Sequence, residues 1–118
     1  MNTITVTIEV PDKELDHILS ACFEGGSNYW IGKPVVCKGN NYKGAEFASE
    51  ALSKGATLLI VEDAGDDKPV TLELTKKKLL AGIAKYAKGN KGIDFDKLDA
   101  LQSDLILQYA LFKKQKYS

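Results

Sequence analysis

Aliphatic and polar residues alternate strictly along the first segment of the chain, from Thr3 to Val10. A period of two is typical of a half-buried β-strand, in which successive side chains point to opposite faces. We therefore predict a strand at residues 3–10 whose polar face, built from threonines and Glu9, meets water. Its buried face is expected to carry Ile4, Val6, Ile8 and Val10.

Three further elements are expected before the middle of the chain. A helix begins at Pro11, and Gly25–Gly26 are expected to end it in a positive-φ conformation. A short strand follows at residues 34–38, and a helix with small apolar residues on its inner face follows at 44–54. The first of these helices has one apolar stripe, formed by Leu15, Ile18, Leu19, Cys22 and Phe23.

The second half of the chain predicts a hairpin and two helices. Strands at 56–63 and 69–74 flank a turn rich in glycine and aspartate, which is a strong hairpin signal. Thr75 is expected to cap a third helix, and Asp94 or Asp96 to begin a fourth. The fourth helix is expected to bury a stripe formed by Leu98, Leu101, Leu105, Tyr109 and Phe112.

These elements predict an α+β fold in which a small, mostly antiparallel sheet of about four strands packs against about four helices. Their order along the chain is β-α-β-α-β-β-α-α. With 118 residues, 44% of them hydrophobic, the chain can bury one core but not two. We predict a single domain at residues 1–112, followed by a basic, frayed tail at 113–118.

The charges and apolar runs exclude several classes of function. Sixteen basic residues balance sixteen acidic ones, so no strong field attracts nucleic acid or an anionic membrane. No apolar run is long enough to span a bilayer and no signal-peptide pattern is present, so we expect a cytoplasmic protein. Cys22 and Cys37 share no metal-ligand or redox spacing, and we expect them to be reduced, partly buried thiols.

The sequence contains no motif for catalysis or cofactor binding. The stretch at 26–33 has the wrong spacing for a phosphate-binding loop, and it follows a helix instead of a strand. His17, the single histidine, lies opposite the apolar stripe of its helix, and no nucleophile is marked near it. We therefore expect no cofactor and no metal site.

The best candidate for a binding site is the loop that follows the first helix. Tyr29 and Trp30 could stack on a planar ligand, while Glu24 and Asn28 bind its polar edge. In the alternative interpretation the glycines cap the helix, and Trp30 fills the core or anchors an interface. The candidate residues of this loop are Glu24, Gly25, Gly26, Ser27, Asn28, Tyr29 and Trp30.

Asp104 and Gln108 are a second pair of candidates, one turn apart on the fourth helix and at the flank of its apolar stripe. If this helix packs beside the loop, the two residues form the opposite polar wall of a ligand pocket. The alternative is an exposed pair that contributes little to stability.

Three segments of the chain resemble a family of short phage and prophage proteins. The segments are EGGSNYW at 24–30, SKGATLLIVEDAGDDKPVTLEL at 53–74 and SDLILQYALF at 103–112. Proteins of this family carry an EGG-x-NYW motif early and an aspartate-bearing helix that ends in Q-x-ALFGE late. Lys113 stands where the family usually has glycine. The resemblance implies a phage setting inside a bacterial host cell, but no reaction.

The loop and the phage setting lead to three hypotheses about function. The first is a counter-defence protein that binds and sequesters a small nucleotide-like immune signal, as a symmetric homo-oligomer. The second is an inhibitor that binds a host defence nuclease or another effector through Tyr29 and Trp30. The third is a small hydrolase that uses Glu24 or Asp104 as a general base, although the sequence marks no nucleophile or metal beside them.

Overall fold

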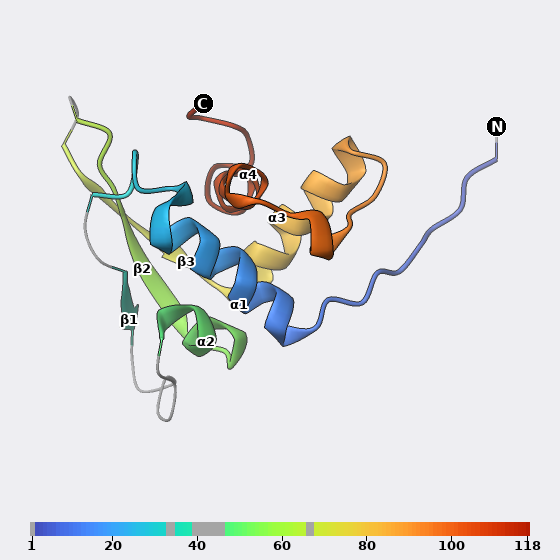
Figure 1. Ribbon diagram of the computed structural model, residues 1–118, viewed down its shortest axis with the longest axis horizontal. Coiled ribbons are helices and arrows are strands. Elements are labelled where there is room, and N and C mark those ends of the chain that lie inside the picture. Colours follow the sequence, from blue (N-terminus) through green and yellow to red (C-terminus); the bar gives the residue numbers. More distant parts are fainter. Residues whose placement is uncertain (1, 33–34, 39–46, 66–67) are drawn as a thin grey trace.

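The computed structural model describes residues 2–32, 35–38, 47–65 and 68–118, and it confirms an α+β fold. Figure 1 shows the sheet at one side of the molecule and the main helices at the other. In chain order the elements are α1 (Asp12–Ala21), the π-type turn η1 (Cys22–Gly26), β1 (Val36–Lys38), α2 (Ala48–Ser53), β2 (Thr57–Glu62), β3 (Val70–Leu74), α3 (Lys76–Gly89), the 3-10 turn η2 (Phe95–Lys97) and α4 (Ala100–Phe112).

The described part of the sheet has three antiparallel strands in the order β1-β2-β3. The predicted hairpin is confirmed, because β2 pairs with β3 from Glu62 opposite Val70 to Leu58 opposite Leu74. Side chains alternate along β2, and Leu58 and Ile60 are buried in the core. The tip of the hairpin at 66–67, the start of the predicted strand at 34 and the start of the predicted helix at 44–46 lie outside the described residues.

The predicted first strand is wrong for this structure. Residues 2–10 form an extended arm that pairs with no strand among the described residues, so the described sheet has three strands instead of about four. Figure 1 shows this arm running away from the body of the molecule to the N-terminus. Alternation specifies which face of a strand is apolar, but a ladder of hydrogen bonds also needs a neighbouring strand, and the described residues provide none beside the arm.

Helix α1 buries the predicted face, with Leu15, Ile18 and Leu19 in the core. The chain continues from α1 into η1, and this turn ends at Gly26, so the helical segment ends at the predicted glycines. The predicted left-handed, positive-φ conformation is not found there. Glycine is required at position 26 for a different reason. A Cβ there would lie 2.8 Å from the Ala100 backbone oxygen, so the turn can approach the start of α4 only without a side chain.

Helix α4 differs from the prediction at its start and on its buried face. Its N-cap is Asp99, which accepts a hydrogen bond from the Gln102 backbone nitrogen, and not Asp94 or Asp96. Asp94 caps η2 instead. Leu101 was part of the stripe that this helix was predicted to bury, but its side chain is 74% exposed. The other stripe residues, Leu98, Leu105, Tyr109 and Phe112, are only half-buried. The face that α4 buries fully, where α1, η1, α3 and β3 pack on it, carries Ser103, Asp104, Ile106, Leu107, Gln108 and Ala110.

Three remaining predictions concern the cap of α3, the state of the cysteines and membrane-spanning helices. Thr75 caps α3 as predicted, because its hydroxyl accepts a hydrogen bond from the Lys78 backbone nitrogen. Both cysteines are free thiols; Cys22 is buried and Cys37 is half-buried. In the part of the chain that the structure describes, no helix has the length and apolar character needed to cross a bilayer.

Candidate functional site

The loop that follows η1 is attached to α4 by the carboxylate of Asp104. One oxygen, Oδ1, accepts hydrogen bonds from Ser27 Oγ at 2.6 Å and from Trp30 Nε1 at 2.7 Å. The other oxygen, Oδ2, accepts from the Tyr29 hydroxyl at 2.5 Å and from Gln108 Nε2 at 3.0 Å. The carboxylate is 2% exposed, and four donors supply the hydrogen bonds that water would otherwise make.

Gln108 extends this network to the end of the chain. Its Oε1 accepts hydrogen bonds from the backbone nitrogens of Lys116 and Tyr117, each at 2.8 Å. Lys116 and the Tyr117 hydroxyl also bond to the carboxylate of Glu62 on β2. The C-terminal residues that were predicted to be frayed therefore fold back over α4. The chain turns there at Lys113, whose φ of 61° is the left-handed conformation that glycine adopts most easily.

The Trp30 ring is enclosed by this same folded-back segment. It stacks on the Tyr117 ring, with the ring centroids 5.6 Å apart and 13° between the planes. It also packs against the Phe112 ring, with the centroids 5.4 Å apart. Its exposed fraction is 0%. Trp30 is thus a core residue whose polar nitrogen is satisfied by Asp104, and this matches the alternative interpretation of the loop.

The far end of the loop is fixed to the sheet. Ile31 forms a bridge with Glu62, and the Asp63 backbone nitrogen donates to the Trp30 oxygen at 2.8 Å. Gly32 lies so close to Asp63 that a Cβ at position 32 would be 2.3 Å from the Asp63 Cβ. The loop is therefore held on one side by α4 and on the other by β2, which preorganises the side chains that it does not bury.

Hydrogen bonding and burial change the ionisation of two groups in the network. Burial of the phenol, followed by its hydrogen bond to the Asp104 carboxylate, raises the pKa of Tyr29 to about 12. Burial alone would raise the pKa of Glu62, but the hydrogen bonds from Lys116 and Tyr117 hold it below its ordinary value. Tyr29 is therefore a donor and Glu62 an acceptor at neutral pH.

The Tyr29 hydroxyl is expected to stay protonated well above pH 10.0, where tyrosine ordinarily ionises, and to titrate near pH 12. The folded state holds this proton more tightly than the unfolded chain, so stability is full below pH 10 and declines as the pH rises from about 10 to about 12. A difference titration of tyrosinate absorbance between the wild type and Tyr29→Phe measures this pKa. Ionisation of Tyr29 near pH 10 would contradict it.

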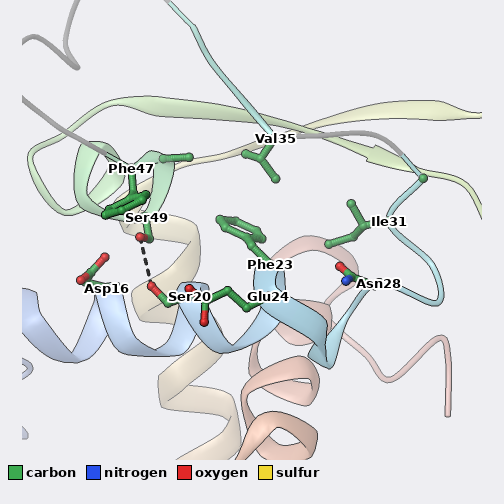
Figure 2. A pocket seen from close by; sticks show the side chains of 11 residues that line it. Asp16, Ser20, Phe23, Glu24, Asn28, Ile31, Val35, Phe47 and Ser49 are labelled. Carbon is green, nitrogen blue, oxygen red and sulfur yellow. Dashed lines mark hydrogen bonds between the residues drawn. The ribbon is translucent and has the colours of Figure 1, made fainter.

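The two loop residues that the network leaves out, Glu24 and Asn28, line a cleft of about 550 Å³ on the opposite side of the loop. Figure 2 shows Phe23 in the middle of this cleft, with Asp16 and Phe47 toward one end and Asn28 and Ile31 toward the other. A cleft of this volume falls in the range that small-molecule sites occupy. Its described lining residues are Asp16, Ser20, Phe23, Glu24, Asn28, Ile31, Gly32, Val35, Phe47, Ala48 and Ser49.

In the described part of the chain, one polar atom in this cleft is buried without a hydrogen-bond partner. Asp16 Oδ1 accepts no hydrogen bond from any described residue, although it is shielded from solvent. Beside it, the hydroxyls of Ser20 and Ser49 lie 3.3 Å apart and join α1 to α2 (Figure 2). A buried carboxylate oxygen without a partner costs free energy, and a bound donor such as an amino group or a hydroxyl would remove that cost.

The lining suits a flat, uncharged or amine-bearing molecule. Two carboxylates, an amide and two hydroxyls offer mainly hydrogen-bond acceptors, while Phe23 and Phe47 offer aromatic faces. The described part of the lining contains no Lys or Arg to pair with an anion. Nor does any group of three or more His, Cys, Asp or Glu side chains form a possible metal site among the described residues.

The structure therefore divides the candidate residues into two groups. Ser27, Tyr29, Trp30, Asp104 and Gln108 come together, as the prediction of a shared wall required, but they bond to each other. Glu24 and Asn28 face the cleft, and Gly25 and Gly26 form the turn between the two groups. Three cleft residues, Asp16, Ser20 and Phe23, were not among the predicted site residues, although their spacing places them on the same side of one helix as Glu24. Phe47 and Ser49 carried no sequence signal.

No family model, curated protein or solved structure matches this chain. The cleft and the residues that line it are therefore the structural basis for inferring a function.

Proposed function

We propose that this chain binds a small, flat, nucleoside-like molecule in the cleft between α1, α2 and the loop, and holds it without chemical change. The observation that carries the proposal is the buried Asp16 Oδ1, which has no hydrogen-bond partner among the described residues and lies at the end of a cleft that also holds Phe23 and Glu24. A nucleobase would place its ring against the aromatic side chains and its amino group at a carboxylate. The acidic lining favours the base and sugar, and any phosphate would point to solvent.

The biological role we propose is counter-defence in a bacterial cytoplasm during phage infection. Binding without turnover would sequester a nucleotide-like immune signal. The support for this role is the resemblance of residues 24–30 and 103–112 to short phage proteins, together with the acceptor-rich cleft beside the first of these segments. Asp104 already accepts four hydrogen bonds, so it does not serve as a general base in this proposal. Trp30 offers no surface to a protein partner.

Calorimetric titration with a panel of nucleosides, cyclic nucleotides and cyclic ADP-ribose variants tests the binding. We expect at least one member to bind with a Kd in the micromolar range or below, and to be recovered intact by mass spectrometry after prolonged incubation. Its parent nucleoside is expected to retain most of the affinity, because the lining recognises the base and sugar. No heat of binding and no thermal shift from any panel member at millimolar concentration would overturn the proposal.

Variants of the cleft locate the site. Asp16→Asn and Glu24→Gln keep the size of the side chain but remove the charge, and we expect each to weaken binding about tenfold or more. Asp96→Asn is the matched control, because Asp96 is exposed on η2 and does not line this cleft. Affinity that stays unchanged in both cleft variants would place the ligand elsewhere.

A further inference from the structure

The extended arm at residues 2–10 leaves an apolar face without a partner in the described chain. Ile4 is 88% exposed, Val6 is 70% exposed and Ile8 is 48% exposed. These three aliphatic side chains share one face of the arm. A monomer seldom leaves such a strip of aliphatic surface exposed to water, because it favours association with another apolar surface. The same segment also presents backbone groups that no described strand satisfies.

The arm's apolar face looks toward α3 across an open groove of about 780 Å³. Val10 precedes α1, whose Asp12 pairs with Lys76 at the start of α3, so the arm runs along α3 from its N-terminal end toward Lys91. One wall of the groove is the arm, with Ile4, Val6, Ile8 and Val10. The other wall is α3 and its C-terminal extension, with Leu80, Ile83, Ala84, Ala87, Lys88, Lys91 and Gly92.

A segment that fills this groove must be complementary to two chemically different walls. Toward α3 it must present aliphatic side chains, and toward the arm it must offer backbone groups for hydrogen bonding. A β-strand with one apolar face does both, since its edge pairs with the arm and its apolar face covers the helix. The arm itself has this character, with aliphatic residues on one face and threonines on the other.

We propose that the arm of a second copy of this chain occupies the groove, so that two arms form an antiparallel two-stranded ribbon over the two α3 helices. Twofold symmetry makes the contact self-complementary, and it closes at two copies. Residues 3–8 carry no charge, so the arms approach without repulsion, and Thr3, Thr5 and Thr7 form cross-strand pairs on the solvent face.

The size of the contact sets its expected strength. Four arm residues and seven residues of α3 and its extension line the groove, which is fewer than the roughly 20 residues a side that standard interfaces use. We therefore expect a reversible dimer that dissociates on dilution. The inference does not depend on the cleft proposed for the nucleoside-like ligand, which is lined by other residues.

Sedimentation velocity on the full chain over a range of concentrations tests the dimer. We expect the wild type to dimerise, Val6→Asp to raise the dimer Kd at least a hundredfold, and Leu101→Asp to change it less than about threefold. Leu101→Asp is the matched control, because it also replaces an exposed aliphatic side chain by aspartate, at a position on α4 that does not line the groove. Val6 lies outside the core of the single chain, so circular dichroism should show that both variants fold.

Hydrogen exchange separates a dimer from an arm that packs on its own chain. Exchange of the arm amides is expected to slow as the protein concentration rises, and not to slow in Val6→Asp. A wild type that stays monomeric at the highest concentration, or a dimer that persists unchanged in Val6→Asp, would overturn the proposal. Arm protection that is independent of concentration would also overturn it.

Discussion

Replacement of Asp104 by alanine is expected to lower the free energy of unfolding by about 4 kcal/mol, a large part of the roughly 5–15 kcal/mol that stabilises a domain of this size. The substitution leaves Ser27 Oγ and Trp30 Nε1 buried without the acceptor that they share, and each such donor costs about 1–3 kcal/mol. Gln108 Nε2 loses one of its two acceptors and keeps the Tyr29 hydroxyl. The loss is smaller than the sum of these costs, because the folded state no longer has to bury a carboxylate. Urea denaturation followed by circular dichroism measures it.

Two further variants make this result specific. Asp104→Asn keeps one oxygen acceptor but places an amide against Gln108 Nε2, so about half of the loss is expected. Asp96→Ala removes an exposed carboxylate from η2 and is expected to change stability by less than about 0.5 kcal/mol. An Asp104→Ala variant with the denaturation midpoint of the wild type would show that the network contributes no net stability.

The second large effect is expected at Gly82, where α3 crosses α4. A Cβ at this position would lie 2.7 Å from the Ile106 backbone oxygen, 2.8 Å from the Ala110 nitrogen and 2.9 Å from the Ala110 Cβ. Two of these atoms belong to the backbone of a buried helix, so they cannot move aside as a flexible side chain would. Gly82→Ala is therefore expected to cost about 2 kcal/mol net, although alanine favours helix over glycine by about 1 kcal/mol.

Gly89 provides the matched control on the same helix. A Cβ at position 89 would meet no atom within 4 Å, so Gly89→Ala is expected to leave stability unchanged or to raise it slightly. Thermal denaturation of the two variants compares their melting temperatures. Because both variants gain the helix propensity of alanine, the difference between them reports the contact between α3 and α4. A Gly82→Ala variant that is at least as stable as Gly89→Ala would contradict the close crossing.

The Asp104 network and the cleft have different physical roles, and this difference guides the binding experiments. The polar groups of the network form hydrogen bonds with one another. Loss of the network would therefore disturb the loop and change ligand affinity only indirectly. The cleft keeps Asp16, Glu24 and Asn28 available to a ligand. An Asp104 variant that loses binding would therefore be uninformative about contacts, whereas Glu24→Gln changes a group that lines the cleft directly.

Several elements were predictable because their signals are local. The hairpin follows from two β-rich runs around a glycine and aspartate turn, and the Thr75 cap follows from a hydroxyl before a helical pattern. Helix α1 follows from apolar residues spaced at one helical turn. Each of these signals depends on neighbours within a few residues, and the tertiary contacts of these elements agree with it.

The sequence alone determined the α+β class, the hairpin, the helices and the segments that carry the unusual residues. Only the tertiary structure decided what those residues do. Asp104 lies 74 residues from Trp30 along the chain, and no periodicity specifies that the carboxylate bonds to the indole. The arm at 3–10 shows the opposite case, in which a clear strand pattern has no neighbouring strand among the described residues. Pairing, burial and enclosure depend on what packs against a segment, which is a property of the folded chain and not of local spacing.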